Sequence, residues 1–282
     1  MPQTINTNLT SLNAQRNLNA SQLSLSTAMQ RLSSGLRVNS AKDDAAGLAI
    51  AERMNTQVRG MAVAMRNAND GISMSQVAEG ALSKVGDALQ RMRELALQAR
   101  NATNSDSDKD SLQKEFRELQ NEINRVLRGT SFNGKRILGS EAATFTFQIG
   151  ANTTDDDIVQ IGFTNLASNA DIMSIVAPAA AIGGSADITA IASVIAYIDN
   201  AIDRINDTRA IYGATQSRFE AIISNLQVAV ENQTAARSRI MDADFAAETA
   251  NLSRAQILQQ AGNAMVAQAN QLPQQVLRLL GG

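Results

Sequence analysis

The sequence predicts a mainly α-helical protein, an elongated rod of long coiled-coil-like helices whose N- and C-terminal helices pair. Of 282 residues, 44% are hydrophobic, 3% are aromatic and only 3 are Pro, a composition that favours long helices packed through aliphatic side chains. Apolar residues also recur in alternating steps of three and four over many heptads, as in helices that wrap around one another. One unbroken helix over residues 187–235 would already be about 73 Å long, whereas a compact globule of this size has a radius of gyration of about 19 Å.

The first half of the chain predicts a series of helices separated by polar turns. Their apolar seams run over Leu25–Leu36, Ala51–Ile72, Ala78–Ala99 and Leu112–Val126. The polar sequence NATNSDSDKD interrupts the pattern before the last of these seams, and Asp110 or Ser111 is the expected N-cap of the helix that follows.

The middle of the chain predicts a small β region. Gly129–Gly139 (GTSFNGKRILG) is expected to be a loop with an Asn-Gly turn. Apolar residues alternate along Thr144–Gly150 and again along Ile158–Phe163, and the polar sequence ANTTDDD joins the two segments. A β-hairpin is therefore expected at about 144–163.

The second half returns to helical spacing after a loop. Thr164–Asp187 has no clear period and is expected to be a loop with a short turn. An isoleucine seam then runs from Ile188 to Ile205 and continues to Val230, and a last seam covers Leu258–Leu279. Neither terminal segment has much to bury against alone. The two ends are therefore expected to pair, and further subunits would complete their thin core.

Charge divides the chain in a similar way. Residues 1–42 carry no acid, and neither do the residues after Glu248, whereas residues 137–203 carry eight acids and no base. The two ends therefore match in character and the middle differs. We expect an inner terminal helical domain of residues 1–42 plus 240–282, and a helical bundle of residues 43–239 that includes the hairpin.

Composition excludes whole classes of function. The chain has no His, Cys or Trp, which rules out thiol nucleophiles, disulfides, histidine-based triads and zinc, haem or iron–sulfur sites built on Cys and His. We expect no enzyme, no cofactor and no metal, although a carboxylate-only Mg²⁺ or Ca²⁺ site stays open. A net charge of −2 does not indicate nucleic acid binding. No Sec-type signal or membrane insertion is expected, because the N-terminus lacks an apolar core and Ile172–Ala186 is too short and interrupted to span a bilayer.

Two acidic clusters each have two interpretations. Asp43-Asp44 could form half of a carboxylate metal or acid–base site, but a helix N-terminus, where Asp caps free N–H groups, is the simpler interpretation. Asp155–Asp157 could bind Ca²⁺. A solvated hairpin tip is favoured there, because no second acidic segment matches it.

Four segments of the sequence stand out: INTNLTSLNAQRNL (Ile5–Leu18), RLSSGLRVNSAKDDAAGLAI (Arg31–Ile50), SFNG (Ser131–Gly134) and ARSRIMDADFAAETANLSRAQILQQAGNAMVAQANQLPQQVLRLL (Ala236–Leu280). They closely resemble bacterial flagellin. The resemblance covers roughly residues 1–139 and 196–282, and motifs of this length argue against a chance match. A hook–filament junction (hook-associated) protein shares the terminal helices and is the nearest alternative. A helical binding module present in few copies is the competing class of function.

The resemblance implies a fold and a role. Flagellin pairs its terminal helices in an inner domain, adds a helical bundle with β elements, and in larger members inserts outer domains, which the short middle of this chain is expected to lack. The implied role is a structural subunit that self-assembles into the flagellar filament for motility. The resemblance also implies export unfolded through the flagellar type III channel, an extracellular location, and an export chaperone, a cap and hook-associated proteins as partners.

The resemblance further implies that the terminal seams are inner-core assembly contacts. These seams comprise Leu25, Met29, Leu32, Leu36, Leu258, Met265, Leu272, Val276, Leu279 and Leu280. Three of the C-terminal leucines, Leu277, Leu279 and Leu280, also resemble the segment that cytosolic inflammasome receptors sense in animal hosts. Inner-core packing is the favoured primary role for these C-terminal leucines.

One helical segment resembles an immune-recognition surface. The sequence QRMRELALQ is similar to the flagellin surface that an animal Toll-like receptor binds, and the matching residues are Gln90, Arg91, Leu95 and Glu115. The plain alternative is an amphipathic helix with its charged residues in solvent. Leu95 lies off the predicted seam, which suits an interface.

Overall fold

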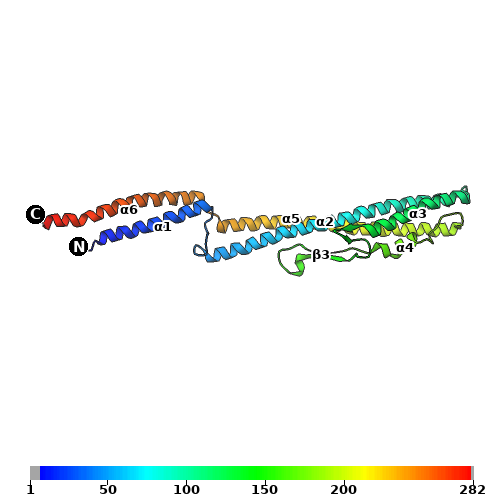
Figure 1. The fold of residues 1–282 in the computed structure, drawn as a ribbon, viewed down its shortest axis with the longest axis horizontal. Coiled ribbons are helices and arrows are strands. Elements are labelled where there is room, and N and C mark those ends of the chain that lie inside the picture. Colours follow the sequence, from blue (N-terminus) through cyan, green and yellow to red (C-terminus); the bar gives the residue numbers. More distant parts are fainter. Residues whose placement is uncertain (1–6, 281–282) are drawn as a thin grey trace. The chain divides into compact units, whose positions relative to one another are not determined.

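The computed structural model describes residues 7–280, with side chains described up to Gln271. The helices are α1 (Leu9–Ser34), α2 (Ala45–Ala99), α3 (Asp106–Gly129), α4 (Ala170–Val176), α5 (Ile188–Met241) and α6 (Phe245–Leu280). The strands are β1 (Ser131–Phe132), β2 (Lys135–Arg136), β3 (Thr144–Gln148) and β4 (Ile158–Gly162), with short 3₁₀ turns η1 (Asp155–Asp157) and η2 (Leu166–Ser168). The expectation of a mainly α-helical fold of long helices is confirmed (Figure 1).

The chain forms two compact units. The first contains the residues up to Thr56 together with those from Glu231 onward, and the second is Gln57–Val230. The first unit holds α1, α6 and the adjoining ends of α2 and α5. The second holds the remainder of α2 and α5 with α3, α4 and all four strands.

The two apolar seams predicted for Ala51–Ile72 and Ala78–Ala99 belong to one helix, α2. With 55 residues, α2 is about 82 Å long. The helix does not break between the seams because residues 73–77 contain neither Pro nor Gly. The buried Ser75 hydroxyl donates to the carbonyl of Gly71 at 2.9 Å, so a polar side chain is satisfied inside the core.

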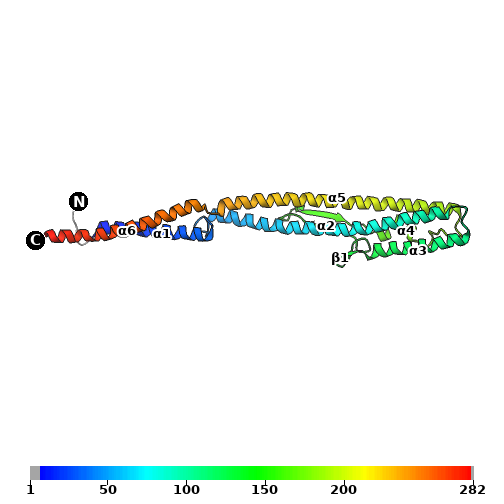
Figure 2. The same cartoon turned by 90° about the horizontal axis from the view of Figure 1, so that it is seen from above.

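Within the second unit, α2 and α5 run antiparallel (Figure 2). A Cβ on Gly71 would come within 2.9 Å of the Phe219 ring, so this glycine permits the close approach of the two helices. Further along, Arg93 Nε donates to Asp199 Oδ1 at 2.6 Å. Fully buried side chains lie along these two helices, among them Leu82, Leu89, Met92, Ile191, Ile198 and Ile205.

The predicted hairpin at about 144–163 is confirmed. β3 pairs with β4 in antiparallel register from Thr144 opposite Gly162 to Gln148 opposite Ile158. Edge-on aromatic contact joins it to α5, since the Phe147 and Phe219 ring centroids are 5.7 Å apart. The Gln148 carbonyl also accepts from Asn67 Nδ2 at 2.9 Å, so the hairpin packs against both long helices.

Tyr212 on α5 is the largest fully buried side chain of this core. Its ring stacks at a tilt on Phe163, with 5.2 Å between the ring centroids. Burial raises the pKa of the Tyr212 hydroxyl to about 12, and the nearby backbone of Thr164 offsets a smaller part of that shift.

The predicted N-cap of α3 is wrong. Ser105, not Asp110 or Ser111, caps the helix, and its side chain and that of Asp108 form a reciprocal capping box. Both residues of the capping box belong to the polar sequence that was expected to form a turn. The helix therefore begins before its apolar seam. Asp110 instead accepts from the backbone N–H of Gly184 at 2.9 Å.

Thr164–Asp187 is more ordered than the expected loop. It contains the single-turn η2 and the seven-residue α4. Buried Gln120 on α3 donates to the carbonyls of Ile175 at 2.5 Å and Ala180 at 3.1 Å, and the N–H of Ile182 donates to Gln113. Because these bonds satisfy an irregular backbone, apolar side chains of the segment can be buried without periodic structure.

The Asn-Gly turn is confirmed between β1 and β2. Asn133 has φ +48° and Gly134 has φ +79°, both in the left-handed region that a tight two-residue hairpin turn requires. Ser131 pairs with Arg136 and Phe132 with Lys135.

Candidate functional site

The candidate site is the pair formed by α1 and α6 in the first unit, which lie side by side in antiparallel fashion (Figure 1). At one end, Asn8 Nδ2 donates to the carbonyl of Ala269 at 2.6 Å, and Ser11 Oγ donates to Asn270 Oδ1 at 2.7 Å. Midway, a Cβ on Gly262 would lie 3.1 Å from the side chain of Leu18. The predicted pairing of the two terminal helices is therefore present within the single chain.

The seam between α1 and α6 is built from small residues. Along the pair, the buried small side chains are Ser11, Ser21, Ala28, Ala255 and Ala269, and the buried Glu248 forms an ion pair with Arg31. Large apolar side chains lie on the outside, among them Leu9, Leu12, Leu23, Met29, Ile257, Leu258 and Met265. A leucine or methionine side chain stabilises a fold by about 1.5–3 kcal/mol only when it is buried. The isolated pair therefore gains little stability from its exposed large apolar side chains.

A groove of about 1010 Å³ runs along the pair. Both helices line it, with Asn and Ser side chains and aliphatic groups such as Leu23, Leu258 and Met265. Small residues at the seam leave this space open, and its lining also includes the charged side chains of Arg31, Glu248 and Arg254.

The structure divides the predicted assembly residues into three groups. Met29, Leu258 and Met265 are exposed by 52%, 52% and 62%. Leu25 and Leu32 are half-buried, and Leu36 packs against a separate small cluster of Val38, Ala51 and Met241. The side chains of Leu272, Val276, Leu277, Leu279 and Leu280 lie outside the described residues.

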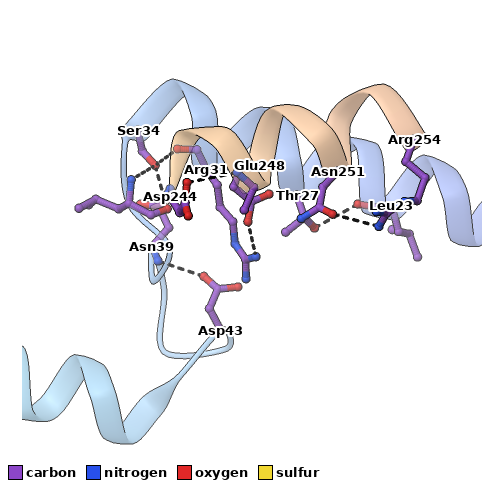
Figure 3. Close-up of polar contacts among 12 residues, drawn as sticks. Leu23, Thr27, Arg31, Ser34, Asn39, Asp43, Asp244, Glu248, Asn251 and Arg254 are labelled. Atoms are coloured by element: carbon purple, nitrogen blue, oxygen red, sulfur yellow. Dashed lines mark hydrogen bonds and ion pairs between the residues drawn. The ribbon is translucent and has the colours of Figure 1, made fainter. Parts of the chain in front are cut away.

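A polar network closes the end of the pair where α6 begins (Figure 3). Arg31 Nη1 donates to Glu248 Oε1 at 3.0 Å, and their side chains are only 30% and 10% exposed. Asp43 accepts from the N–H groups of Asn39 and Ser40. These backbone bonds are the main reason why its pKa lies below the ordinary value, and the nearby charge of Arg31 adds to them.

Asp44 and Asp244 cap helices, as the simpler interpretation expected for Asp44, whereas Asp43 accepts from N–H groups of the loop before α2. Asp44 Oδ1 accepts from the N–H of Gly47 at 2.8 Å in the first turn of α2, and Asp244 Oδ1 accepts from the N–H of Ala246 at 2.9 Å at the start of α6. The ion pair between Arg31 and Glu248 was not foreseen. The charge pattern of the sequence indicates it, because Glu248 is the last acid of the sequence and residues 1–42, with which its helix pairs, carry only basic charges.

The segments that lead into α2 and α6 are tied together by backbone bonds. The N–H of Ala243 donates to the carbonyl of Gly35 at 2.9 Å, and the N–H of Arg37 donates to the carbonyl of Met241 at 2.6 Å. Gly35 has φ +71° and ends α1 in the left-handed conformation that glycine adopts without strain. The path of the chain between the helices is therefore fixed by hydrogen bonds within the first unit.

The structure separates the residues of the expected receptor surface. Gln90, Arg91 and Glu115 are exposed, and Arg91 Nε donates to Glu115 Oε1 at 2.8 Å, which joins α2 to α3. Leu95 is completely buried, so the expectation that it lies on the surface is wrong. Because α2 packs against both α3 and α5 here, its apolar stripe is wider than one seam. The exposed leucine of this segment is Leu97.

Two other features bear on function. Within residues 7–280, no group of three or more His, Cys, Asp or Glu side chains is arranged to hold a metal ion, and Asp155 and Asp156 point into solvent at the hairpin tip. None of the described helices is both long and apolar enough to cross a membrane.

Comparison with known proteins covers nearly the whole chain. Residues 5–143 match the bacterial flagellin N-terminal helical region, and residues 195–280 match the bacterial flagellin C-terminal helical region. A flagellin of Halalkalibacterium halodurans is 45% identical over 276 residues, which are 98% of this chain and 99% of that protein. A flagellin of Xenorhabdus nematophila is 43% identical over 312 aligned residues, with 99% of this chain and all of that protein covered.

Among solved structures, Bacillus cereus flagellin is 28% identical, with a TM-score of 0.48 over 57% of this chain and 88% of that one. The two family matches leave out residues 144–194. This interval contains the β3–β4 hairpin, α4 and the first residues of α5.

Proposed function

The chain belongs to the bacterial flagellin family and is a structural subunit of the flagellar filament, and on this basis we propose that its α1–α6 pair is the element through which copies assemble. The observation that supports this proposal is the pattern of burial in the pair: small residues are buried at its seam, and large apolar residues are exposed on its outside. A neighbouring copy would cover the exposed leucines and methionines and enter the groove between the helices.

The proposed inner domain is residues 1–42 plus 240–282, and residues 43–239 form the bundle. The two compact units support this division, although the unit boundaries at Thr56 and Glu231 assign the adjoining ends of α2 and α5 to the inner part. The inner domain would carry the assembly contacts of the terminal seams. The bundle would hold the shape of the subunit, since its core is filled by large side chains.

Further parts of the proposed role come from the family. Flagellin relatives form the bacterial flagellum, which lies outside the cell. We infer export through the flagellar channel, with a chaperone, a cap and hook-associated proteins as partners, and no catalytic activity. Gln90, Arg91 and Glu115 remain the proposed contact of an animal Toll-like receptor, because all three are exposed together. Leu277, Leu279 and Leu280 remain the proposed segment for an inflammasome sensor.

Seeded assembly of the purified protein tests this function. Monomer mixed with short filament fragments should elongate them, as measured by sedimentation and seen by negative-stain microscopy. A junction protein or few-copy binding module would not elongate them, so failure of the wild-type chain at high concentration would favour the alternatives.

Variants of the exposed seam test the assembly element itself. Leu258→Ser together with Met265→Ser should abolish elongation while leaving the melting of the second unit unchanged, because neither side chain is buried in the monomer. Met173→Ser is the matched control, since Met173 is 43% exposed on α4. Normal elongation by the double variant would refute the assignment.

A further inference from the structure

Asn133 and Gly134, in the turn between β1 and β2, are the only Asn-Gly pair of the sequence. Both residues are exposed. A Cβ on Gly134 would meet no other part of the chain within 4 Å, and the Gly134 N–H makes no hydrogen bond with any residue that the structure describes. The hairpin around the turn has only two residue pairs, and short hairpins are marginally stable in water. Little therefore holds the backbone in place between Asn133 and Gly134.

An asparagine in such a turn can react with the residue that follows it. The backbone nitrogen of the next residue bonds to the side-chain carbon Cγ of the asparagine, and the bond from Cγ to Nδ2 breaks. The side-chain nitrogen leaves as ammonia and takes the backbone proton, which leaves a five-membered succinimide ring. Water then opens the ring at either carbonyl, so the product is aspartate or isoaspartate. Glycine in the next position has no side chain to obstruct the attack.

The exposed Asn39-Ser40 pair has the same chemistry available, but its backbone is held. The N–H of Ser40, which carries the attacking nitrogen, donates to Asp43 Oδ2 at 2.9 Å. The N–H of Asn39 donates to the same oxygen at 3.1 Å. Attack on Cγ would have to break the bond to Ser40, and a hydrogen bond to a charged acceptor is among the stronger ones. The fold therefore protects Asn39.

Asn104-Ser105, the second Asn-Ser pair of the sequence, is held at both reacting groups. The N–H of Ser105 donates to Asp108 Oδ2 at 3.0 Å within the capping box of α3. Asn104 Nδ2 donates to the carbonyl of Gln98 at 2.6 Å, which fixes the side chain that would be attacked. Asn133 differs from both pairs, because the attacking nitrogen of Gly134 has no such bond within residues 7–280.

We propose that Asn133 is a site of spontaneous deamidation that the native fold leaves open. The reaction consumes only water, so the modified protein accumulates with age. The aspartate product keeps the two-residue turn, because Asp also adopts positive φ there. Isoaspartate adds a methylene group to the main chain and disrupts the pairing of β1 with β2. The damage stays local, because the N–H of buried Ile137 donates to the carbonyl of Thr130 at 3.1 Å, next to the hairpin.

Deamidation rates in folded and unfolded protein test this proposal. The chain is kept in mildly alkaline buffer with or without guanidinium chloride and is digested with trypsin at intervals. Peptides 129–135 and 38–42 contain one asparagine each, Asn133 and Asn39, so mass spectrometry assigns each conversion of amide to acid. Folding should slow Asn133 by no more than about tenfold, because the turn opens easily. It should slow Asn39 by at least about tenfold more, because hydrogen bonds hold that backbone.

Two variants serve as matched controls. Asn133→Gly keeps the turn, since glycine adopts positive φ without strain, but has no side-chain amide. Labelling of the folded protein by an isoaspartyl methyltransferase should therefore fall to background. Asp43→Ala removes the acceptor that holds Ser40, so it should speed deamidation of Asn39 in the folded protein and leave the rate at Asn133 unchanged. Circular dichroism should show that both variants are folded.

Three results would overturn the proposal. Equal slowing of Asn133 and Asn39 by folding would show that the native turn protects its asparagine. Undiminished isoaspartyl labelling of Asn133→Gly would place the reactive site elsewhere in the chain. An unchanged rate at Asn39 in the folded Asp43→Ala variant would show that a bonded backbone nitrogen is not what separates the two sites.

Discussion

Ile198 shows at the residue scale why the isoleucine seam of α5 matters for folding. It is fully buried between α5 and α2. We predict that Ile198→Asp lowers the free energy of unfolding by about 4 kcal/mol, because it buries a carboxylate with no partner. Urea unfolding followed by circular dichroism measures this loss. The neighbouring Tyr197 is 44% exposed, and Tyr197→Asp should change stability by less than about 0.5 kcal/mol.

Tyr212 makes stability depend on alkaline pH. Its folded pKa of about 12 lies above the unfolded value of about 10, so the unfolded chain releases this proton first as the pH rises. Stability should therefore be complete below pH 10 and fall by about 2 kcal/mol between pH 10 and 12. Tyr212→Phe should remove that part of the decline, whereas Tyr197→Phe should leave it. Urea unfolding at pH 9 and pH 11 compares the three proteins.

At the scale of elements, the two units should differ in local stability. We predict that amides of α1 and of residues 245–271 in α6 exchange rapidly in dilute monomer, because the helices share a seam of small residues and bury few large ones. Amides of α2 within Ala78–Ala99 should exchange slowly, since that stretch lines the core of the second unit. Hydrogen exchange measured on monomer and then on filament should show strong protection of the terminal helices only in the filament. Strong protection in the monomer would contradict the proposed assembly role.

The sequence predicts most helices and strands, but it does not predict where each one ends or that a helix packs against a second partner. Periodicity identifies a helix or strand from the face that it buries, so the sequence predicts α5 and the hairpin. The start of α3 instead depends on the Ser105 capping box, which lies before the apolar seam begins. One seam per helix assumes one packing partner. Leu95 is buried because α2 has two. Order in residues 164–187 rests on side chains of α3 far away in the sequence, which no local pattern reveals.

At the scale of the whole molecule, folding and assembly should be separable. Removing residues 245–282 deletes α6 but leaves the core of the second unit intact, because none of its buried cluster lies in α6. We predict that the truncated chain keeps the melting transition of that unit and loses seeded elongation. Circular dichroism melting and sedimentation measure the two properties on the same sample. Elongation by the truncated chain would refute the role of α6, and complete loss of folding would show that the units form one cooperative system.

The pairing of α1 with α6 also sets an order in time. Arg31 and Glu248 are 217 positions apart, and Asn8 and Ala269 are 261 apart, so α1 finds its partner only after the much later α6 has been synthesised. Contacts of such long range are slow to form, because almost the entire chain must close into a loop. A chain that stops short of Phe245 has no partner for α1 at all. Assembly through this pair, as we propose, would therefore exclude a chain that lacks α6.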